Sequence, residues 1–398
     1  MSIDQQRFKE QGFLILRNLI DPAKLESLRA NIEHMVDRRR DLALQRRLPT
    51  DPACGTWAAS GQPRLQLDID CDADSIGAIE FLASDHCLEV CRQLIDADYI
   101  VPHNFSCICS SESHDAGPAR WHRDIGVGDP APLEGMIANM QHHGPSYLQW
   151  NIALYEDNVF WIVPGSHHRS NSEVENRHLA ADSTAPLPGS IPVELGPGDG
   201  VVYTHLLLHW GSNYTRKLRR TIHPGFRPFG YPAMPNVHWR HWEPGFYHYL
   251  QPEIRERFET WDRLFFTELD RFAQLFRAAI DRRPDTFAQY FEHIHPSSQG
   301  RAVSLVMLHR INLKLQRLLS GEAPASDLWG NGRDFTYLGS HFTSEDGIVL
   351  KRRFSELDRL LQAPVARETP SFQGDTTLYE PNTMPDEIAL ESFITSWA

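Results

Sequence analysis

The residues best suited to chemistry form the segment Trp121-His122-Arg123-Asp124. In an extended strand, residues i and i+2 point to the same side, so His122 and Asp124 can direct an imidazole and a carboxylate at one point. Two histidines and one carboxylate on one face of an octahedron leave three positions open, which is the usual arrangement of non-haem Fe(II) sites that activate oxygen. A His-x-Asp pair alone is more often a surface polar pair, so a second histidine has to be found.

Two candidates for that histidine follow a Gly198-Asp199 turn, in an apolar run that contains His205 and ends at His209. The two histidines are four residues apart and share strand parity. His209 stands at the strand end, on a rim, where a ligand is well placed. We therefore favour His209 and keep His205 as the alternative.

Two adjacent arginines, Arg219 and Arg220, follow His209 after a Gly-Ser-Asn turn. A hairpin of that length would bring an arginine back beside His209. Inside a barrel, a guanidinium commonly holds a carboxylate through a bidentate pair. With two adjacent arginines, we expect one to point inward and the other outward.

The elements that must position these residues are short strands between about residues 97 and 230. Runs rich in β-branched and aromatic residues alternate there with Gly, Pro, Asn and Asp, as in a sandwich or jelly-roll barrel. Two longer stretches, 125–146 and 167–190, are expected to be loops that wall the site. The candidate substrate contacts in the first are Met136, Met140, His142 and His143.

Helices are predicted on both sides of this region. A strand at 13–16 is followed by Asp21-Pro22, an N-cap with proline at the first helical position. Beyond residue 250, large apolar side chains recur every three or four positions, which predicts one helix near 254–276 and another at 301–319. The tail after about residue 365 is polar and irregular.

Composition excludes several functional classes. The chain has 398 residues, of which 41% are hydrophobic, and a net charge of −13. That acidity argues against binding to nucleic acid or to an anionic membrane surface. No apolar run approaches the roughly 20 residues of a membrane span, and the first residues do not resemble a secretory signal. The six cysteines all lie between Cys54 and Cys109, without the spacing of a zinc ribbon, so we expect reduced thiols in a cytoplasmic protein.

With these motifs in place, the chain resembles the phytanoyl-CoA dioxygenase family of Fe(II)- and 2-oxoglutarate-dependent oxygenases. The resemblance covers roughly residues 5–230, and the region after 250 has no counterpart. The matching motifs, in the family's order, are Trp-His122-Arg-Asp124, Val163-Pro-Gly-Ser-His167, Gly198-Asp199, and His209 with Arg220 eleven residues on.

The resemblance implies a fold, a metal site and a reaction. The fold would be α+β, with a double-stranded β-helix (jelly-roll, cupin-like) core, flanking N-terminal helices and a helical C-terminal extension. It would bind Fe(II) through His122, Asp124 and His209, and the distal carboxylate of 2-oxoglutarate through Arg220. Gln149 or Asn151, which alternate along one strand, would contact the cosubstrate or the substrate. The reaction would use O2 to hydroxylate an unactivated C–H bond of a small organic or natural-product substrate, releasing succinate and CO2.

The sequence departs from the family at two positions. Arg123 stands between the two proximal ligands, where the family often has glutamine. Gly211 stands two residues after His209, where a serine sometimes assists the cosubstrate. Because Asp124 is present, and related halogenases lack this carboxylate, hydroxylation or another oxidation is favoured over halogenation.

The expected organisation is an oxygenase domain at 1–235, a helical extension at 236–364 and an irregular tail at 365–398. The extension would also offer a homodimer contact. Two other functions remain open: a cupin-like metalloenzyme that does not use 2-oxoglutarate, and a non-catalytic binding protein on the same fold. The cupin-like enzyme would not need a buried arginine, so Arg220 discriminates it from the oxygenase. The binding protein should have lost a metal ligand.

Overall fold

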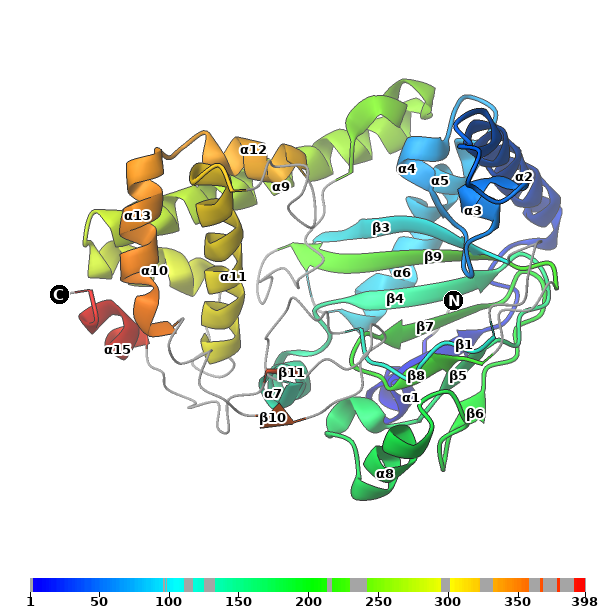
Figure 1. Cartoon of the computed structure of the whole chain (residues 1–398), viewed down its shortest axis with the longest axis horizontal. Helices are drawn as coiled ribbons and strands as arrows, with labels where there is room; N and C mark the ends of the chain where they lie inside the picture. The colour runs from blue at the N-terminus through cyan, green and yellow to red at the C-terminus, as the bar shows by residue number, and fades with distance from the viewer. Residues whose placement is uncertain are drawn as a thin grey trace.

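The computed structural model describes residues 3–95, 97, 99–110, 117–124, 133–212, 217–229, 242–294, 301–322, 332–357, 366–367, 378–379 and 390–397. Two antiparallel sheets face each other on one side of the molecule, and a bundle of helices lies on the other (Figure 1).

The larger sheet has six strands, each antiparallel to its neighbours. In spatial order they are β1 (Phe13–Leu16), β7 (Gly200–Thr204), β4 (Leu148–Ala153), β9 (Arg220–Phe229), β3 (Tyr99–Cys109) and β2 (Arg64–Gln66). The strand predicted at 13–16 is thus the edge strand β1. The β9 side chains alternate between the two faces of this sheet, which decides below which of them reach the site.

The smaller sheet contains β6 (Ile191–Pro192), β5 (Phe160–Ile162) and β8 (His209–Gly211). An isolated antiparallel bridge joins His122 to His209, so the segment around residue 122 extends this sheet beyond β8. Residues from both sheets, including Phe13, Ala153 and Phe160, form one buried cluster between them. The fold is therefore α+β with a double-stranded β-helix core, as the sequence predicted.

Helices from the N-terminal part cover the outer face of the larger sheet. They are α1 (Gln5–Gln11), α2 (Pro22–Gln45), α3 (Gly55–Ala58), α4 (Leu67–Asp70), α5 (Gly77–Leu82) and α6 (Asp85–Leu94). The predicted start of α2 is confirmed: the Asp21 side chain accepts a hydrogen bond from the Ala23 amide, and Pro22 is the first helical residue. Ile32 and Val36 of α2 are fully buried against this face.

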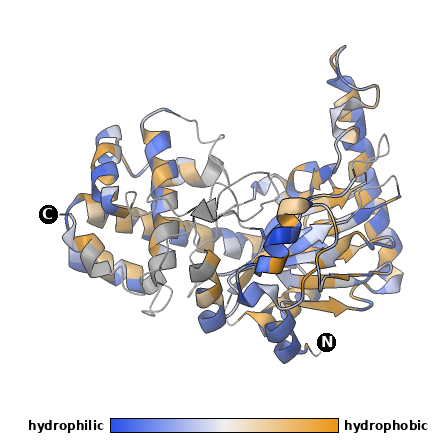
Figure 2. Cartoon of the chain, turned by 60° about the horizontal axis from the view of Figure 1, so that its bottom comes forward, coloured by the Kyte–Doolittle hydropathy of each residue, from blue (hydrophilic) through white to orange (hydrophobic). Residues whose placement is uncertain are grey.

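The C-terminal part is helical. After the short 3-10 helix η2 (Pro244–Tyr249) come α9 (Pro252–Ile280), α10 (Pro284–Ile294), α11 (Arg301–Leu319), α12 (Gly332–Gly339) and α13 (Ser344–Arg353). The predicted apolar stripe forms the buried side of α9, and the helix predicted at 301–319 is α11. Figure 2 shows hydrophilic and hydrophobic residues sharing these helices, as expected where only one side of each packs on a core.

Three predicted irregular stretches contain regular structure. The first expected loop includes α7 (Leu133–His143), and the second includes η1 (Ser166–His168) and α8 (Glu173–Ala181). Helix α8 begins with a capping box, in which the Ser172 hydroxyl and the Glu175 carboxylate each accept a hydrogen bond from the other residue's amide. The tail contains β10 (Ala366–Arg367), β11 (Leu378–Tyr379) and α15 (Leu390–Thr395), and Phe393 of α15 is buried against the bundle.

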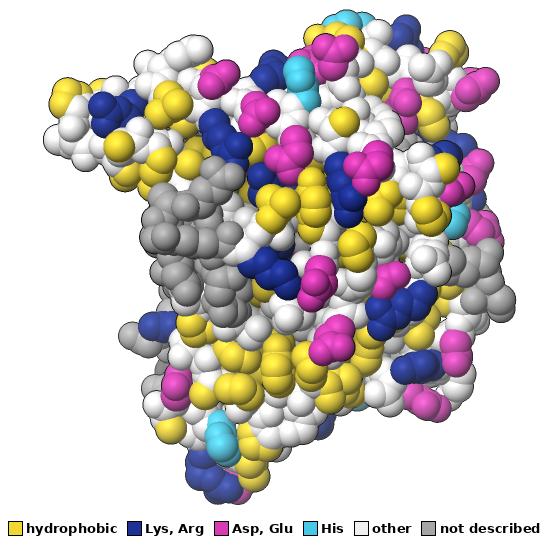
Figure 3. Space-filling view, turned by 90° about the vertical axis from the view of Figure 1, so that its right-hand side faces the viewer, with side chains coloured by type: hydrophobic (Ala, Val, Ile, Leu, Met, Phe, Trp, Pro, Cys, Tyr) yellow, Lys and Arg dark blue, Asp and Glu magenta, His cyan; other side chains and the backbone are white. Residues whose placement is uncertain are grey.

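Two features expected from the composition can be compared with the structure: the distribution of charged side chains and the apolar character of the helices. On the face in Figure 3, basic and acidic side chains are interspersed rather than gathered by sign. Within the described ranges, no helix combines the length and the apolar character needed to cross a bilayer. The predicted domain boundaries and the homodimer contact stay predictions.

Candidate metal centre

Three side chains converge where the bridge joins the 117–124 segment to β8. The Nε2 atom of His209 lies 3.1 Å from Asp124 Oδ2, and the Nε2 atom of His122 lies 3.5 Å from Asp124 Oδ1. One ligand atom from each residue lies within 4.8 Å of the other two. The structure therefore brings together the predicted group His122, Asp124 and His209, which is a facial donor set for a divalent metal.

Backbone carbonyls orient both imidazoles. His122 Nδ1 lies 2.8 Å from the Arg120 carbonyl oxygen, and His209 Nδ1 lies 2.7 Å from the Leu207 carbonyl oxygen. Since a carbonyl only accepts hydrogen bonds, each Nδ1 carries the proton and each Nε2 presents its lone pair toward Asp124. This second layer of contacts fixes the tautomer that metal ligation requires.

The electrostatics of the group also suit a metal. Burial, together with the neighbouring His209, lowers the pKa of His122 to about 4, so this imidazole is neutral at neutral pH. Burial acts to raise the pKa of Asp124, but the His209 charge and hydrogen bond outweigh it and hold this pKa well below its usual value. A neutral His122 imidazole and an ionised Asp124 carboxylate are the protonation states in which these two residues bind a cation.

Arg123, the departure between the ligands, points away from them. Its guanidinium donates to the Ser166 carbonyl at 2.8 Å, to the Leu206 carbonyl, and to Asn171 Oδ1 at 3.0 Å. Arg123 is 4% exposed, and these bonds connect its own segment to the segments around Ser166 and Leu206. The residue between the ligands thus supports the site rather than entering it.

The other two motifs are structural supports. Ser166, in the segment that begins at Val163, accepts a hydrogen bond from the Leu208 amide at 2.8 Å, next to the ligand His209. Asp199 accepts hydrogen bonds from Arg17 at 2.6 Å and from the Asn18 amide at 2.9 Å, which fixes the turn before β7.

One of the two adjacent arginines faces inward and the other outward, as expected. The inward one is Arg219, whereas the resemblance assigns the inward role to Arg220. Arg220 lies on the outer face of β9, where its guanidinium donates to Glu33 of α2 at 3.0 Å. Arg219 lies between the sheets, where its Nε donates to Asp157 Oδ2 at 2.8 Å. Asp157 also accepts a hydrogen bond from Thr221, which pairs with Ala153 on the inner face. The structure therefore turns Arg219 inward, between the sheets, and Arg220 outward, toward α2. The contact of Arg220 with 2-oxoglutarate, which the resemblance implied, is not tested by these contacts.

Polar side chains line the inner face of the larger sheet next to the ligands. Gln149 and Asn151 both lie there, 6% and 2% exposed. Asn151 Oδ1 lies 2.8 Å from His223 Nδ1, and the Trp150 carbonyl lies at the same distance from that nitrogen. Burial, together with the Arg64 charge, lowers the pKa of His223 to about 3, so this ring is neutral. Contact between Gln149 or Asn151 and a cosubstrate stays a prediction.

The alternative ligand and the predicted loop contacts occupy other positions. His205 contributes a backbone carbonyl that accepts the Asp124 amide at 3.0 Å, and it is not part of the ligand group. On α7, Met140 Sδ accepts a hydrogen bond from Thr204 at 3.3 Å, and His142 is exposed. Met136 and His143 lie on the same helix, and residues 125–132 of this predicted wall lie outside the described residues.

Of four further residues at the site, the sequence interpretation missed Tyr147, Asp157 and His223, and it named Arg219 without choosing it over Arg220. One signal would have found two of them. Ile222 and Phe226 are apolar and even-numbered, so they mark the even positions of β9 as the face that packs under the helices. Arg219 and His223 fall on the other parity and therefore face inward.

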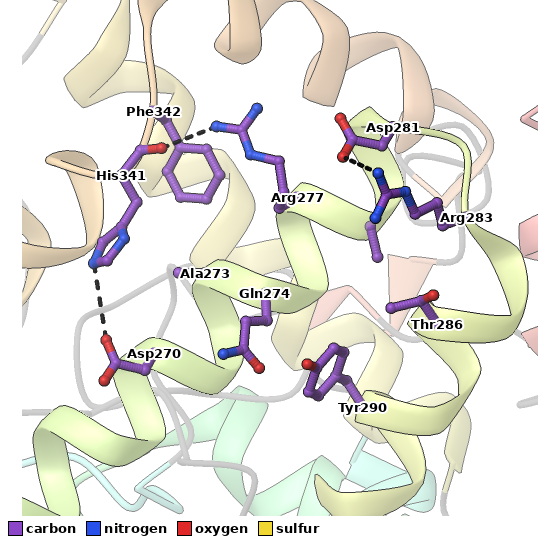
Figure 4. A pocket seen from close by; sticks show the side chains of 11 residues that line it. Asp270, Ala273, Gln274, Arg277, Asp281, Arg283, Thr286, Tyr290, His341 and Phe342 are labelled. Atoms are coloured by element: carbon purple, nitrogen blue, oxygen red, sulfur yellow. Dashed lines mark hydrogen bonds and ion pairs between the residues drawn. The ribbon is translucent and has the colours of Figure 1, made fainter.

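A cavity lies among the described residues of the helical extension (Figure 4). Its charged side chains are paired at its rim: His341 with Asp270 at 3.9 Å, and Arg283 with Asp281 at 3.6 Å. Arg277 donates to the His341 carbonyl at 2.9 Å. With these groups paired, we assign this cavity no role in the chemistry.

A double-stranded β-helix with two histidines and one carboxylate at a strand end defines a class of non-haem metal proteins. The phytanoyl-CoA dioxygenase (PhyH) sequence pattern matches residues 8–221, which is more than half of the chain. The chain belongs to the PhyH family. No curated protein matches its sequence.

Solved structures resemble the chain over a little more than half of its length. AviO1 from Streptomyces viridochromogenes is 22% identical, with a TM-score of 0.39, over 56% of this chain and 92% of that one. EctD from S. alaskensis with bound Fe is 15% identical, with a TM-score of 0.41, over 57% and 77%. HygX from Streptomyces hygroscopicus, solved with nickel and 2-oxoglutarate, is 16% identical, with a TM-score of 0.40, over 57% and 88%.

Proposed function

We propose that this protein is an Fe(II)- and 2-oxoglutarate-dependent dioxygenase that hydroxylates a small organic substrate. The observation that carries the proposal is the group His122, Asp124 and His209, whose two imidazoles are buried and oriented by backbone carbonyls. Membership of the PhyH family supports the same activity. Iron bound to these residues together with 2-oxoglutarate would supply the oxidation of a C–H bond by O2, with release of succinate and CO2.

The chain's own part is to hold the reactants and exclude water. His122, Asp124 and His209 would occupy one face of the metal and leave the opposite face to the keto acid and O2. Arg219 is buried between the sheets, beyond Thr221 along β9, on the inner face. A guanidinium in that place would bind the far carboxylate of 2-oxoglutarate by charge-assisted hydrogen bonds.

Asp157 gives this arginine its orientation. It holds the Nε edge of Arg219 at 2.8 Å, and both side chains are less than 10% exposed. A planar guanidinium held along one edge keeps a fixed direction, and preorganisation of this kind lowers the entropic cost of binding. We therefore assign the cosubstrate contact to Arg219 and a structural contact with α2 to Arg220.

An anaerobic titration tests both assignments. Apoprotein receives Fe(II) and then 2-oxoglutarate, and the visible charge-transfer band of the chelated keto acid is followed. Wild type should form the band, and Asp124→Ala should not, because a metal ligand is lost. Arg219→Gln should weaken 2-oxoglutarate binding by about tenfold to a hundredfold, since a hydrogen bond to a charged group contributes about 1.5–3 kcal/mol. Arg220→Gln is the matched control and should bind normally.

Each other outcome has a definite meaning. Normal binding in Arg219→Gln with weakened binding in Arg220→Gln would restore the assignment made from the sequence. Iron binding without a band in wild type would favour the cupin-like metalloenzyme that does not use 2-oxoglutarate. Absence of iron binding would reject the enzyme and favour a binding protein.

A further inference from the structure

The phenol of Tyr147 lies inside the barrel, across β9. Tyr147 precedes β4 and shares the parity of Gln149 and Asn151, which face inward. Its ring fills the space next to Gly225, which pairs with Gln149. A Cβ atom built on Gly225 would lie 1.8 Å from the Tyr147 hydroxyl oxygen and 2.4 Å from its Cζ. Only glycine at position 225 therefore leaves room for the phenol.

This position is next to the metal ligands. The Tyr147 ring meets the ring of His205 edge-on, with centroids 5.8 Å apart, and the His205 carbonyl holds the amide of the ligand Asp124. On its other side, the ring meets His103 edge-on at 5.7 Å. Burial and the Asp124 charge raise the pKa of Tyr147, which agrees with a phenol close to that carboxylate.

The Tyr147 hydroxyl is not used by the fold. Tyr147 is only 3% exposed, yet no hydrogen bond to its hydroxyl is found among the residues that the structure describes. The Oε1 atom of Gln149, one step along the same inner face, is buried without a hydrogen-bond partner in the described part of the chain. Buried polar groups of native proteins are normally hydrogen-bonded, so the Gln149 Oε1 atom beside the Tyr147 hydroxyl requires an explanation.

A bound substrate supplies that explanation. We propose that Tyr147 is a substrate-contacting residue, whose phenol forms a wall of the substrate chamber beside the metal and whose hydroxyl hydrogen-bonds a polar group of the substrate. The inference rests on the proposed oxygenase function. A hydroxyl and an amide oxygen at neighbouring positions suit a substrate that carries its own hydroxyl or amine there, rather than a plain hydrocarbon chain.

The placement of Tyr147 has a chemical consequence that requires no knowledge of the substrate. In protein loaded with Fe(II), 2-oxoglutarate and O2 but no substrate, a Tyr147 ring that lines the substrate chamber would itself be open to oxidation. One oxygen atom of O2 replaces an aromatic hydrogen, which becomes the proton of the new hydroxyl, and the other enters succinate as 2-oxoglutarate loses CO2. The tyrosine becomes a catechol, oxidised by two electrons, and O2 takes up four electrons from the ring and the keto acid together.

The experiment is an aerobic incubation of the loaded protein without substrate, followed by peptide mapping by mass spectrometry. The expected result is one added oxygen atom on Tyr147. Asp124→Ala should show no added oxygen, because a metal ligand is lost. Tyr147→Leu should show no added oxygen at position 147, because the phenol is absent. Gly225→Ala should displace the phenol and reduce the oxidation while the anaerobic band still forms. Tyr155→Phe is the matched control. Tyr155 packs under Arg29 on the outer side, so this substitution should not change the amount of oxygen added to Tyr147.

Failure of this inference is distinct from failure of the proposed function. A protein that never forms the anaerobic band is not the proposed oxygenase. A protein that forms the band but leaves Tyr147 unmodified overturns the inference alone. Oxidation of Tyr203 instead would also overturn it, because Tyr203 meets the ligand His209 edge-on at 5.4 Å and would mark a chamber on that side.

Discussion

Asp157 is the residue on which the orientation of Arg219 depends. It accepts hydrogen bonds from Arg219, from Thr221 and from the Val159 amide, and its side chain is 2% exposed. Asp157→Asn should destabilise the protein by about 3–5 kcal/mol, because it leaves the buried Arg219 charge without a counter-ion. Urea unfolding at neutral pH measures this difference. Asp37→Asn, which changes a 70% exposed carboxylate of α2, is the control and should have little effect.

The same carboxylate predicts a pH dependence. Burial acts to raise the pKa of Asp157, but the Arg219 charge and three hydrogen bonds outweigh it and place this pKa below the ordinary 3.8. A group with a lowered folded-state pKa stabilises the fold fully above its unfolded pKa and loses this effect as the pH falls through the folded value. The stability difference between wild type and Asp157→Asn should therefore be constant above about pH 5 and narrow below pH 3.8. If the stability difference between wild type and Asp157→Asn grew as the pH fell, the assignment of a lowered pKa to Asp157 would be wrong.

At the scale of single residues, the sequence was sufficient where spacing alone decides. His122 and Asp124 share a side of an extended chain whatever surrounds them, so their convergence could be predicted. The assignment of Arg219 and Arg220 depended on where the pleat of β9 begins after the turn, and a shift of one residue exchanges inside for outside. Tyr147 could not be identified, because its role depends on the space that Gly225 leaves on another strand.

At the scale of elements, an ion pair connects the barrel to the helical extension. Arg227 of β9 donates to both carboxylate oxygens of Glu268 on α9, at 2.6 Å and 3.2 Å. The guanidinium also lies over the rings of Phe229 and Phe265, 4.5 Å and 4.9 Å from their centroids. Because Arg227 is 3% exposed, this contact is a buried connection between β9 and α9.

Removing the Glu268 carboxylate should weaken the contact between β9 and α9. Glu268→Ala leaves the Arg227 charge buried and should cost about 3–5 kcal/mol of unfolding free energy. Hydrogen exchange should show α9 opening more readily in this variant, because its contact with β9 is lost. Glu259→Ala, on the exposed side of the same helix, is the control and should change stability by no more than about 0.5 kcal/mol. Equal effects of the two substitutions would show that the ion pair does not hold α9.

Helix prediction succeeded for α9, whose apolar stripe is long, and failed for the short helices α7 and α8. Helix α9 spans 29 residues and carries an uninterrupted apolar stripe, so its presence could be predicted. Helices α7 and α8 have 11 and 9 residues, and their sequences contain the polar residues that also mark loops. Their helical state depends on docking against the barrel and on the Ser172–Glu175 cap, and that docking could not be inferred from local composition.

At the scale of the whole molecule, the barrel and the extension share one hydrophobic core. A single buried cluster runs from the N-terminal helices through the outer face of the larger sheet to α9, α11 and α15. Three rings join the two parts: Phe105 of β3 lies 5.9 Å from Trp242 and 6.0 Å from Phe258 of α9, and Trp242 lies 5.1 Å from Phe258. The extension therefore completes the outer layer that supports β3 and β9, the strands that carry the inner wall of the site.

Because this core is continuous, the chain should unfold in one cooperative transition. Circular dichroism, which reports the helices of the extension, and loss of the keto-acid charge-transfer band, which reports the barrel, should have the same midpoint in urea. Phe258→Ala removes a fully buried ring and should cost about 3–5 kcal/mol. If the core is shared, this substitution in the extension lowers both midpoints equally. Two separate transitions in wild type, or a shift of the helical signal alone in Phe258→Ala, would mean that the barrel is stable without its extension and that the metal site does not depend on it.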